Sequence, residues 1–203
     1  MTAFEFAQRS KLRFNDLALL VQALTHPSYC NETAGECADN QRMEFLGDAI
    51  VDFIVAEMLY KRFGTRDEGE LTRLRAALVN TESLGAIAAT LRLGEALRIG
   101  RGEEAGGGRA RLTQLCNALE AVIGAIYLDS GMEAARAFVL PLMERRLDEV
   151  QANALDRDPR SLLQEQMQAV TGETPRYEVV GQSGPDHARE WRVQVYIGDR
   201  VAG

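Results

Sequence analysis

Apolar residues recur at helical spacing from Leu17 to about Val150, and few stretches of this region alternate between apolar and polar positions. Glycines punctuate the pattern at Gly64, Gly69, Gly94, Gly100, the 106–108 run and Gly131. Isolated and clustered glycines of this kind are typical of loops and helix ends. We therefore expect most of the chain to fold as an all-helical domain whose helices are joined by short loops.

The pattern changes after residue 152, where a polar stretch ends at Asp158-Pro159, a plausible start for a helix. Residues 160–170 predict that helix, and the alternating runs 176–180 and 191–197 predict two strands. A third strand would begin near Gly203, so we expect this small domain to be truncated before its last helix.

The predicted organisation is therefore a helical domain over 1–152, a linker over 153–158 and an incomplete α+β domain over 159–203. The fold class is mainly α. No apolar run reaches membrane-spanning length, and the N-terminus lacks the charged-then-apolar order of a secretory signal. We expect a cytoplasmic protein with no membrane partner.

The net charge of −7 is unusual for a protein that binds nucleic acid, although a local basic stripe can coexist with an acidic remainder. A cluster of carboxylates that holds cations would also make the total negative. The chain contains only two histidines, His26 and His187, which argues against zinc catalysis. The cysteines Cys30, Cys37 and Cys116 are odd in number and fit no zinc spacing, so we expect thiols and no bridge.

Two predicted helices carry candidate chemistry. In the first, over 41–63, Glu44 and Asp48 are four residues apart and share one face. The second, over 112–129, is apolar nearly all round, as buried helices are, yet it contains Asn117 and Glu120.

A carboxylate in a buried helix is costly unless something pairs with it. One interpretation is a salt bridge between Glu120 and an arginine. The other is a cluster of oxygen ligands for a hard divalent cation such as Mg²⁺, which could support phosphodiester hydrolysis. The spacing of the acidic residues leaves both interpretations open.

Residues 42–50, RMEFLGDAI, closely resemble the nine-residue stretch that identifies ribonuclease III. The resemblance covers nearly the whole of 10–150 in order. It continues through ALTHPSYCNE (23–32), EGELTRLRAALVNTESL (68–84), GEALRIGRGEEAGGGRAR (94–111) and ALEAVIGAIYLDSG (118–131). The resemblance implies the helical nuclease fold of that family.

Carried over by position, the resemblance implies that Glu44 is a metal ligand and Asp48 a catalytic carboxylate near the metal. It implies that Glu120 is both a bridging ligand and a catalytic residue, with position 117 completing the ligand set. Glu68 matches a further acidic position near the cleft. The implied cofactor is Mg²⁺, which Mn²⁺ can replace, with no small-molecule cofactor.

The resemblance also implies a homodimer on double-stranded RNA, in which each subunit cuts one strand. The products would carry 5′-phosphates and short 3′ overhangs, and the substrates would be rRNA, mRNA and tRNA precursors.

Two positions depart from the family pattern, because Asn117 and Gln41 stand where the family has carboxylates. Each change keeps the side-chain shape and removes a negative charge, which weakens cation binding. Three interpretations compete: a natural enzyme with a weaker metal site, a duplex-binding protein that cleaves poorly or not at all, and an engineered substitution. We expect an active enzyme with a raised metal requirement.

Residues 158–198 resemble a double-stranded-RNA-binding domain, which reads duplex RNA by shape. The resemblance implies groove contacts from Gln164, Glu165 and His187. The lysine-rich second helix that grips phosphates in this family is absent, so we expect weak RNA binding through this tail. The basic stretch 98–111 is either a phosphate contact or a solvated mobile loop.

Overall fold

The structure is a computed structural model of the 203-residue chain, and it describes residues 1–152, 159–184, 189–198 and 200–201. The chain divides into two compact units, Met1–Asp156 and Arg157–Gly203. The predicted linker, 153–158, lies outside the described residues. No helix in the described part of the chain is long and apolar enough to cross a membrane.

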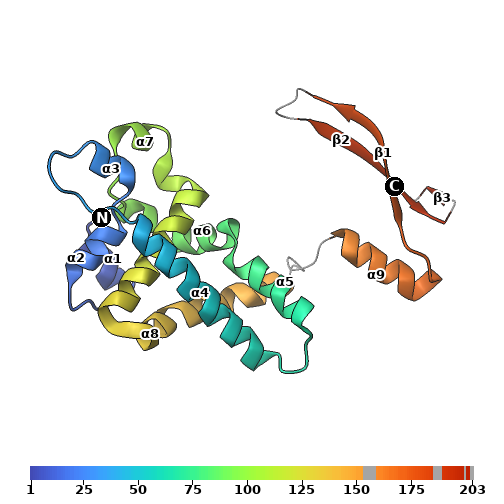
Figure 1. The fold of residues 1–203 in the computed structure, drawn as a ribbon, viewed down its shortest axis with the longest axis horizontal. Coiled ribbons are helices and arrows are strands. Elements are labelled where there is room, and N and C mark those ends of the chain that lie inside the picture. The colour runs from blue at the N-terminus through green and yellow to red at the C-terminus, as the bar shows by residue number, and fades with distance from the viewer. Residues whose placement is uncertain (153–158, 185–188, 199, 202–203) are drawn as a thin grey trace. The chain divides into compact units, whose positions relative to one another are not determined.

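The first unit is all-helical, as the hydrophobic pattern predicts (Figure 1). Its elements are α1 (Ala3–Arg9), α2 (Leu17–Ala23), α3 (Pro27–Asn31), α4 (Gln41–Arg62), α5 (Glu68–Val79), α6 (Thr81–Thr90), the 3-10 turn η1 (Leu93–Ala96), α7 (Arg101–Ala105), the 3-10 turn η2 (Gly108–Ala110) and α8 (Leu112–Ala152). The two helices that were predicted to carry the acidic residues are confirmed within α4 and α8.

Helices α4 and α8 cross at backbone contact distance because each presents a glycine to the other. A Cβ atom at Gly47 of α4 would collide with the backbone carbonyl oxygen of Glu120, and one at Gly124 of α8 would collide with that of Met43. Only glycine permits two helix backbones to approach this closely. The crossing therefore fixes the position of Glu120 relative to the first turns of α4.

The long helix α8 contains a break at Gly131, whose φ of 80° and ψ of −175° are not helical. Before the break, the Asp129 carboxylate accepts hydrogen bonds from the backbone N–H groups of Asn15 and Asp16. This contact ties the bend in α8 to the N-terminus of α2. The predicted helix 112–129 is thus the first segment of α8, and a second segment continues to Ala152.

The mobile-loop interpretation of residues 98–111 is wrong, because most of the stretch folds into α7 and η2. Arg109 pairs with Glu104 and donates to the carbonyl oxygens of Gly94 and Leu97. Arg111 pairs with Glu103. Ion pairs within the segment, and hydrogen bonds from Arg109 to the residues just before it, therefore hold the segment in place.

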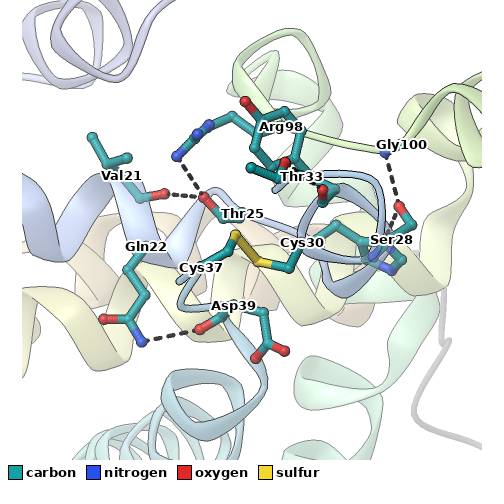
Figure 2. Close-up of a disulfide and its surroundings, with 12 residues drawn as sticks. Val21, Gln22, Thr25, Ser28, Cys30, Thr33, Cys37, Asp39, Arg98 and Gly100 are labelled. Atoms are coloured by element: carbon teal, nitrogen blue, oxygen red, sulfur yellow. Dashed lines mark hydrogen bonds between the residues drawn. A yellow bond between two sulfur atoms is a disulfide. The ribbon is translucent and has the colours of Figure 1, made fainter. Parts of the chain in front are cut away.

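The expectation of three thiols is also wrong, because Cys30 and Cys37 form a disulfide (Figure 2), while Cys116 is free and buried. Cys30 lies in α3, and the chain doubles back through the exposed residues 31–36. The return brings the two Cα atoms to 5.3 Å, within the range that a disulfide spans. Cysteine spacing does not reveal this return, since the path of the loop decides it.

Hydrogen bonds hold the chain on both sides of the disulfide (Figure 2). The Gln22 side chain donates to the carbonyl oxygen of Asp39, and the Ser28 hydroxyl accepts from the backbone N–H of Gly100. The buried Thr25 hydroxyl donates to a carbonyl of α2 and accepts from Arg98. The disulfide thus closes an exposed loop whose two ends are already anchored.

The second unit contains α9 (Pro159–Thr171), β1 (Arg176–Ser183), β2 (Glu190–Ile197) and β3 (Arg200–Val201). The strands form an antiparallel sheet in the order β1-β2-β3. Within the first pair, Arg176 lies opposite Tyr196 and Ser183 opposite Glu190. The predicted helix and both alternating strands are confirmed, as is the α+β class of this unit.

We predict that Gly47→Ala destabilises the protein by about 3 kcal/mol, the upper range for overpacking, because the new Cβ meets backbone that cannot rotate away. Urea unfolding followed by circular dichroism measures the difference. Gly64→Ala is the matched control, since no atom lies within 4 Å of its Cβ position. Equal midpoints for the two variants would contradict the close crossing.

We predict that Cys37→Ser lowers the free energy of unfolding by about 2 kcal/mol, the low end for a disulfide, because the bridge closes a short loop. Unfolding midpoints with and without dithiothreitol measure this effect. The reductant should lower the midpoint of the wild type and leave that of the variant unchanged. An unfolding midpoint of the wild type that is unchanged by dithiothreitol would rule out a stabilising disulfide.

Candidate metal and catalytic site

The candidate site lies where α4 crosses α8. Glu44 and Asp48 project from one face of α4, Glu44 partly buried and Asp48 exposed. Across the crossing, α8 contributes Asn117, partly buried, and Glu120, which is only 8% exposed. The structure therefore brings Glu44 and Asp48 close enough to Glu120 for their charges to act on it, and Asn117 lies three residues before Glu120 on α8.

Burial and neighbouring charges raise the pKa of two carboxylates of this region. Burial, together with the charges of Asp48, Glu44 and Asp52, raises the pKa of Glu120 to about 7, against a hydrogen bond from Cys116 that lowers it. Burial, and then the charge of Asp48, also raises the pKa of Glu44. Like charges are thus concentrated around a buried carboxylate, an arrangement that a bound cation would offset.

The salt-bridge interpretation of Glu120 is wrong for the described part of the chain. None of the ion pairs found among these residues includes Glu120. Its hydrogen-bond partner is the Cys116 thiol, a weak and neutral donor. The buried charge is therefore not neutralised by a basic side chain among the described residues, which leaves protonation or a bound cation to do so.

The donor set suits a hard divalent cation. Glu44, Asp48 and Glu120 offer carboxylate oxygens, and Asn117 offers a neutral carbonyl oxygen, the ligand types that Mg²⁺ prefers. No group of three His, Cys, Asp or Glu side chains in the described residues lies close enough together to hold an ion unaided. Mg²⁺ retains several water ligands, so its protein ligands need not all contact it directly.

Asp52 is a member of this region that the sequence analysis missed. It lies four residues after Asp48 on the same face of α4, and its charge contributes to the raised pKa of Glu120. The spacing of Glu44, Asp48 and Asp52 was visible in the sequence as a row of acids one helical turn apart.

Two other positions were singled out in the sequence, Glu68 and Gln41. Glu68 is the first residue of α5 and lines a hollow of about 410 Å³ together with Tyr60, Leu71 and Arg75. Gln41, the first residue of α4, is exposed. Within one subunit, neither side chain is among the groups whose charge or hydrogen bonds shift the pKa of Glu120.

The predicted RNA-contacting residues belong to the second unit. Gln164 is exposed on α9, and Glu165 lies in the same helix. His187 lies outside the described residues. The groove contacts expected of these three residues stay predictions.

A row of apolar side chains is exposed on α4 beside the acidic face. Phe45 is 81% and Tyr60 74% exposed, and Phe53 is half-exposed between them. With Ala49 and Ala56 these residues follow helical spacing, and we call the five the α4 apolar stripe. Contiguous exposed apolar surface of this kind marks interaction sites in proteins.

Comparison with known proteins gives consistent results. A family model described as "Ribonuclease-III-like" matches residues 16–147, and the "Double-stranded RNA binding motif" matches residues 159–203. The chain is 45% identical to "Ribonuclease 3" of Desulforamulus reducens over 98% of this chain and 83% of that protein. It is 43% identical to "Ribonuclease 3" of Roseiflexus sp. over 98% and 85%, respectively.

Solved structures give the same result for the first unit. The nuclease domain of ribonuclease III from Campylobacter jejuni matches with a TM-score of 0.64 and 42% identity, over 70% of this chain and 93% of that one. A second structure of that nuclease domain, described as showing flexibility in a region involved in dimer formation, matches with a TM-score of 0.65 over 70% and 96%.

We predict that the pH dependence of stability reports the buried Glu120. Its pKa is about 7 in the folded protein and near 4.5 when unfolded, so the folded state binds the proton more tightly. This group therefore destabilises the metal-free protein above pH 7, by about 3 kcal/mol, and the penalty disappears as pH falls toward 4.5. Glu120→Gln removes the penalty at every pH.

Thermal unfolding without metal, from pH 5 to pH 8, tests this prediction. The variant should be more stable than the wild type at pH 8, and the difference should shrink at pH 5. Parallel curves for the two proteins would show that Glu120 is not a buried carboxylate of raised pKa.

Proposed function

Since the chain belongs to the ribonuclease III family and is thereby an endoribonuclease of double-stranded RNA, we propose that its activity depends on magnesium and resides in the cluster of Glu44, Asp48, Asn117 and Glu120. The observation that carries the proposal is the buried Glu120 carboxylate, which faces further carboxylates and has no basic partner among the described residues. Such a group is a functional-site candidate on physical grounds.

We propose that Glu44, Glu120 and the carbonyl oxygen of Asn117 would hold the cation. When bound, Mg²⁺ or Mn²⁺ would offset charge on the attacked phosphate and lower the pKa of a water molecule. Asp48 is exposed and so reaches the substrate side of the cluster, where its carboxylate can accept a proton from the attacking water. We propose that the bond between the phosphorus and the 3′ oxygen breaks, so that the products carry a 3′-hydroxyl and a 5′-phosphate.

The α4 apolar stripe supports a homodimer. A two-fold interface uses the same patch on both subunits, and a projecting Phe45 ring together with the hollow beside Tyr60 gives one surface both a protrusion and a recess. The acidic face borders the stripe, so dimerisation would place two clusters on one assembly. Each would cut one RNA strand, and an offset between them would leave short 3′ overhangs.

The substrates that we propose are duplex segments of rRNA, mRNA and tRNA precursors, by membership of the family. The second unit would contact one minor groove through α9, where Gln164 is exposed, and the next groove through the loop between its first two strands. Glu165 and His187 are proposed contacts of the same kind.

A non-catalytic duplex-binding protein is the second candidate, because Asn117 and Gln41 lower the charge of the site. Incubation of the chain with a perfect RNA duplex and Mg²⁺ or Mn²⁺ separates the two. Cleavage that Glu44→Gln abolishes supports the enzyme, whereas binding without cleavage in either metal supports the alternative.

We predict that Asn117→Asp lowers the Mg²⁺ concentration for half-maximal cleavage by about tenfold, because it adds an anionic ligand. Magnesium titrations of duplex cleavage by both proteins measure this. Asp148→Glu on the far part of α8 is a control that leaves the net charge of the site unchanged. Equal metal dependence of wild type and Asn117→Asp would exclude position 117 from the ligand set.

We predict that Phe45→Asp converts the protein from dimer to monomer, since it places a charge in the α4 apolar stripe that the proposed dimer would bury. Sedimentation velocity measures the mass. Phe4→Asp, which alters another exposed phenylalanine outside the stripe, should leave the mass unchanged. A Phe45→Asp variant that sediments like wild type would place the interface elsewhere.

A further inference from the structure

The thiol of Cys116 contacts the most buried carboxylate of the candidate site. Cys116 and Glu120 lie one helical turn apart on α8, and the sulfur donates a hydrogen bond to Glu120 Oε1 at 3.4 Å. Cys116 is 4% exposed and Glu120 is 8% exposed, so water has little access to this contact. A weak donor can orient a carboxylate under these conditions because no solvent competes with it.

The contact is also the one hydrogen bond to the Glu120 carboxylate among the described residues. Oε2 therefore has no donor there and is available to a cation. The nearby negative charges of Glu44, Asp48 and Asp52 repel the carboxylate. Without a donor on Oε1, this repulsion would favour rotamers that turn Glu120 away from the other acids.

We propose that Cys116 is a positioning residue, whose S–H···Oε1 hydrogen bond holds Glu120 in the orientation that presents Oε2 to the divalent cation. The inference rests on the proposed function of the cluster. It deepens that proposal by assigning a role to a neutral residue that contacts neither RNA nor the cation.

Serine and alanine at position 116 form a matched pair for the test. The two side chains have nearly the same volume, so both relieve packing equally, but only serine keeps a hydrogen-bond donor. Calorimetric titration of the RNA-free protein with Mg²⁺ measures the affinity for the cation. Duplex-cleavage assays measure the Mg²⁺ dependence of the activity. Thermal unfolding verifies that both variants are folded.

The expected result is that Cys116→Ala weakens Mg²⁺ affinity about tenfold, as loss of a ligand-orienting partner does, and leaves the KM for duplex RNA unchanged. Cys116→Ser should stay within about twofold of wild type, since its hydroxyl is at least as good a donor. This rescue by serine is a result that a packing role would not produce, because burial of a hydroxyl without a partner is costly.

Equal affinities of the alanine and serine variants would overturn the inference, whether both match wild type or both fall. If the alanine and serine variants have equal Mg²⁺ affinities while the wild type binds Mg²⁺ and cuts RNA, only the positioning role of Cys116 is wrong. A wild type that neither binds Mg²⁺ nor cuts duplex RNA would overturn the proposed function and this inference together.

Discussion

The backbone contact between α4 and α8 is the constraint on which the rest of the site depends. Gly47 and Gly124 remove the side chains that would separate the two helices, so the helix backbones touch. Side chains one turn away on either helix are then forced into the same region. Glu44 and Glu120 meet for this reason, and a side chain at either glycine would move the two helices apart and disperse the acids.

The close crossing concentrates charge in a part of the protein that excludes water. A carboxylate that is 8% exposed and has only a thiol as hydrogen-bond donor makes the metal-free fold less stable above neutral pH. The buried apolar side chains along the seam between the helices offset this cost. The role proposed for Glu120 thus opposes the stability of the metal-free fold, and a bound cation would offset that cost because it binds the ionised form.

Helix α4 serves three purposes on three adjoining faces. Its buried face packs on α8, its acidic face carries Glu44 and Asp48, and the α4 apolar stripe is exposed beside the acids. Because side chains advance by about 100° per residue, a shift of one position in this helix would exchange these roles. In the proposed dimer this arrangement would couple subunit association to the site, since a partner that covers the stripe would lie next to the carboxylates.

The sequence by itself determined the helical class, the limits of α4, the strands of the second unit and the family. Hydrophobic periodicity and short sequence motifs are properties of residues that are neighbours along the chain. It also singled out Glu120, since a carboxylate in an apolar helix is conspicuous. The tertiary structure alone decided that Glu120 has no arginine partner among the described residues and that Glu44, Asp48 and Asp52 of α4 lie near it. It also decided that the loop after α3 returns so that Cys30 and Cys37 are bridged. The first fact depends on how two helices pack and the second on the path of a loop, and spacing along the chain records neither.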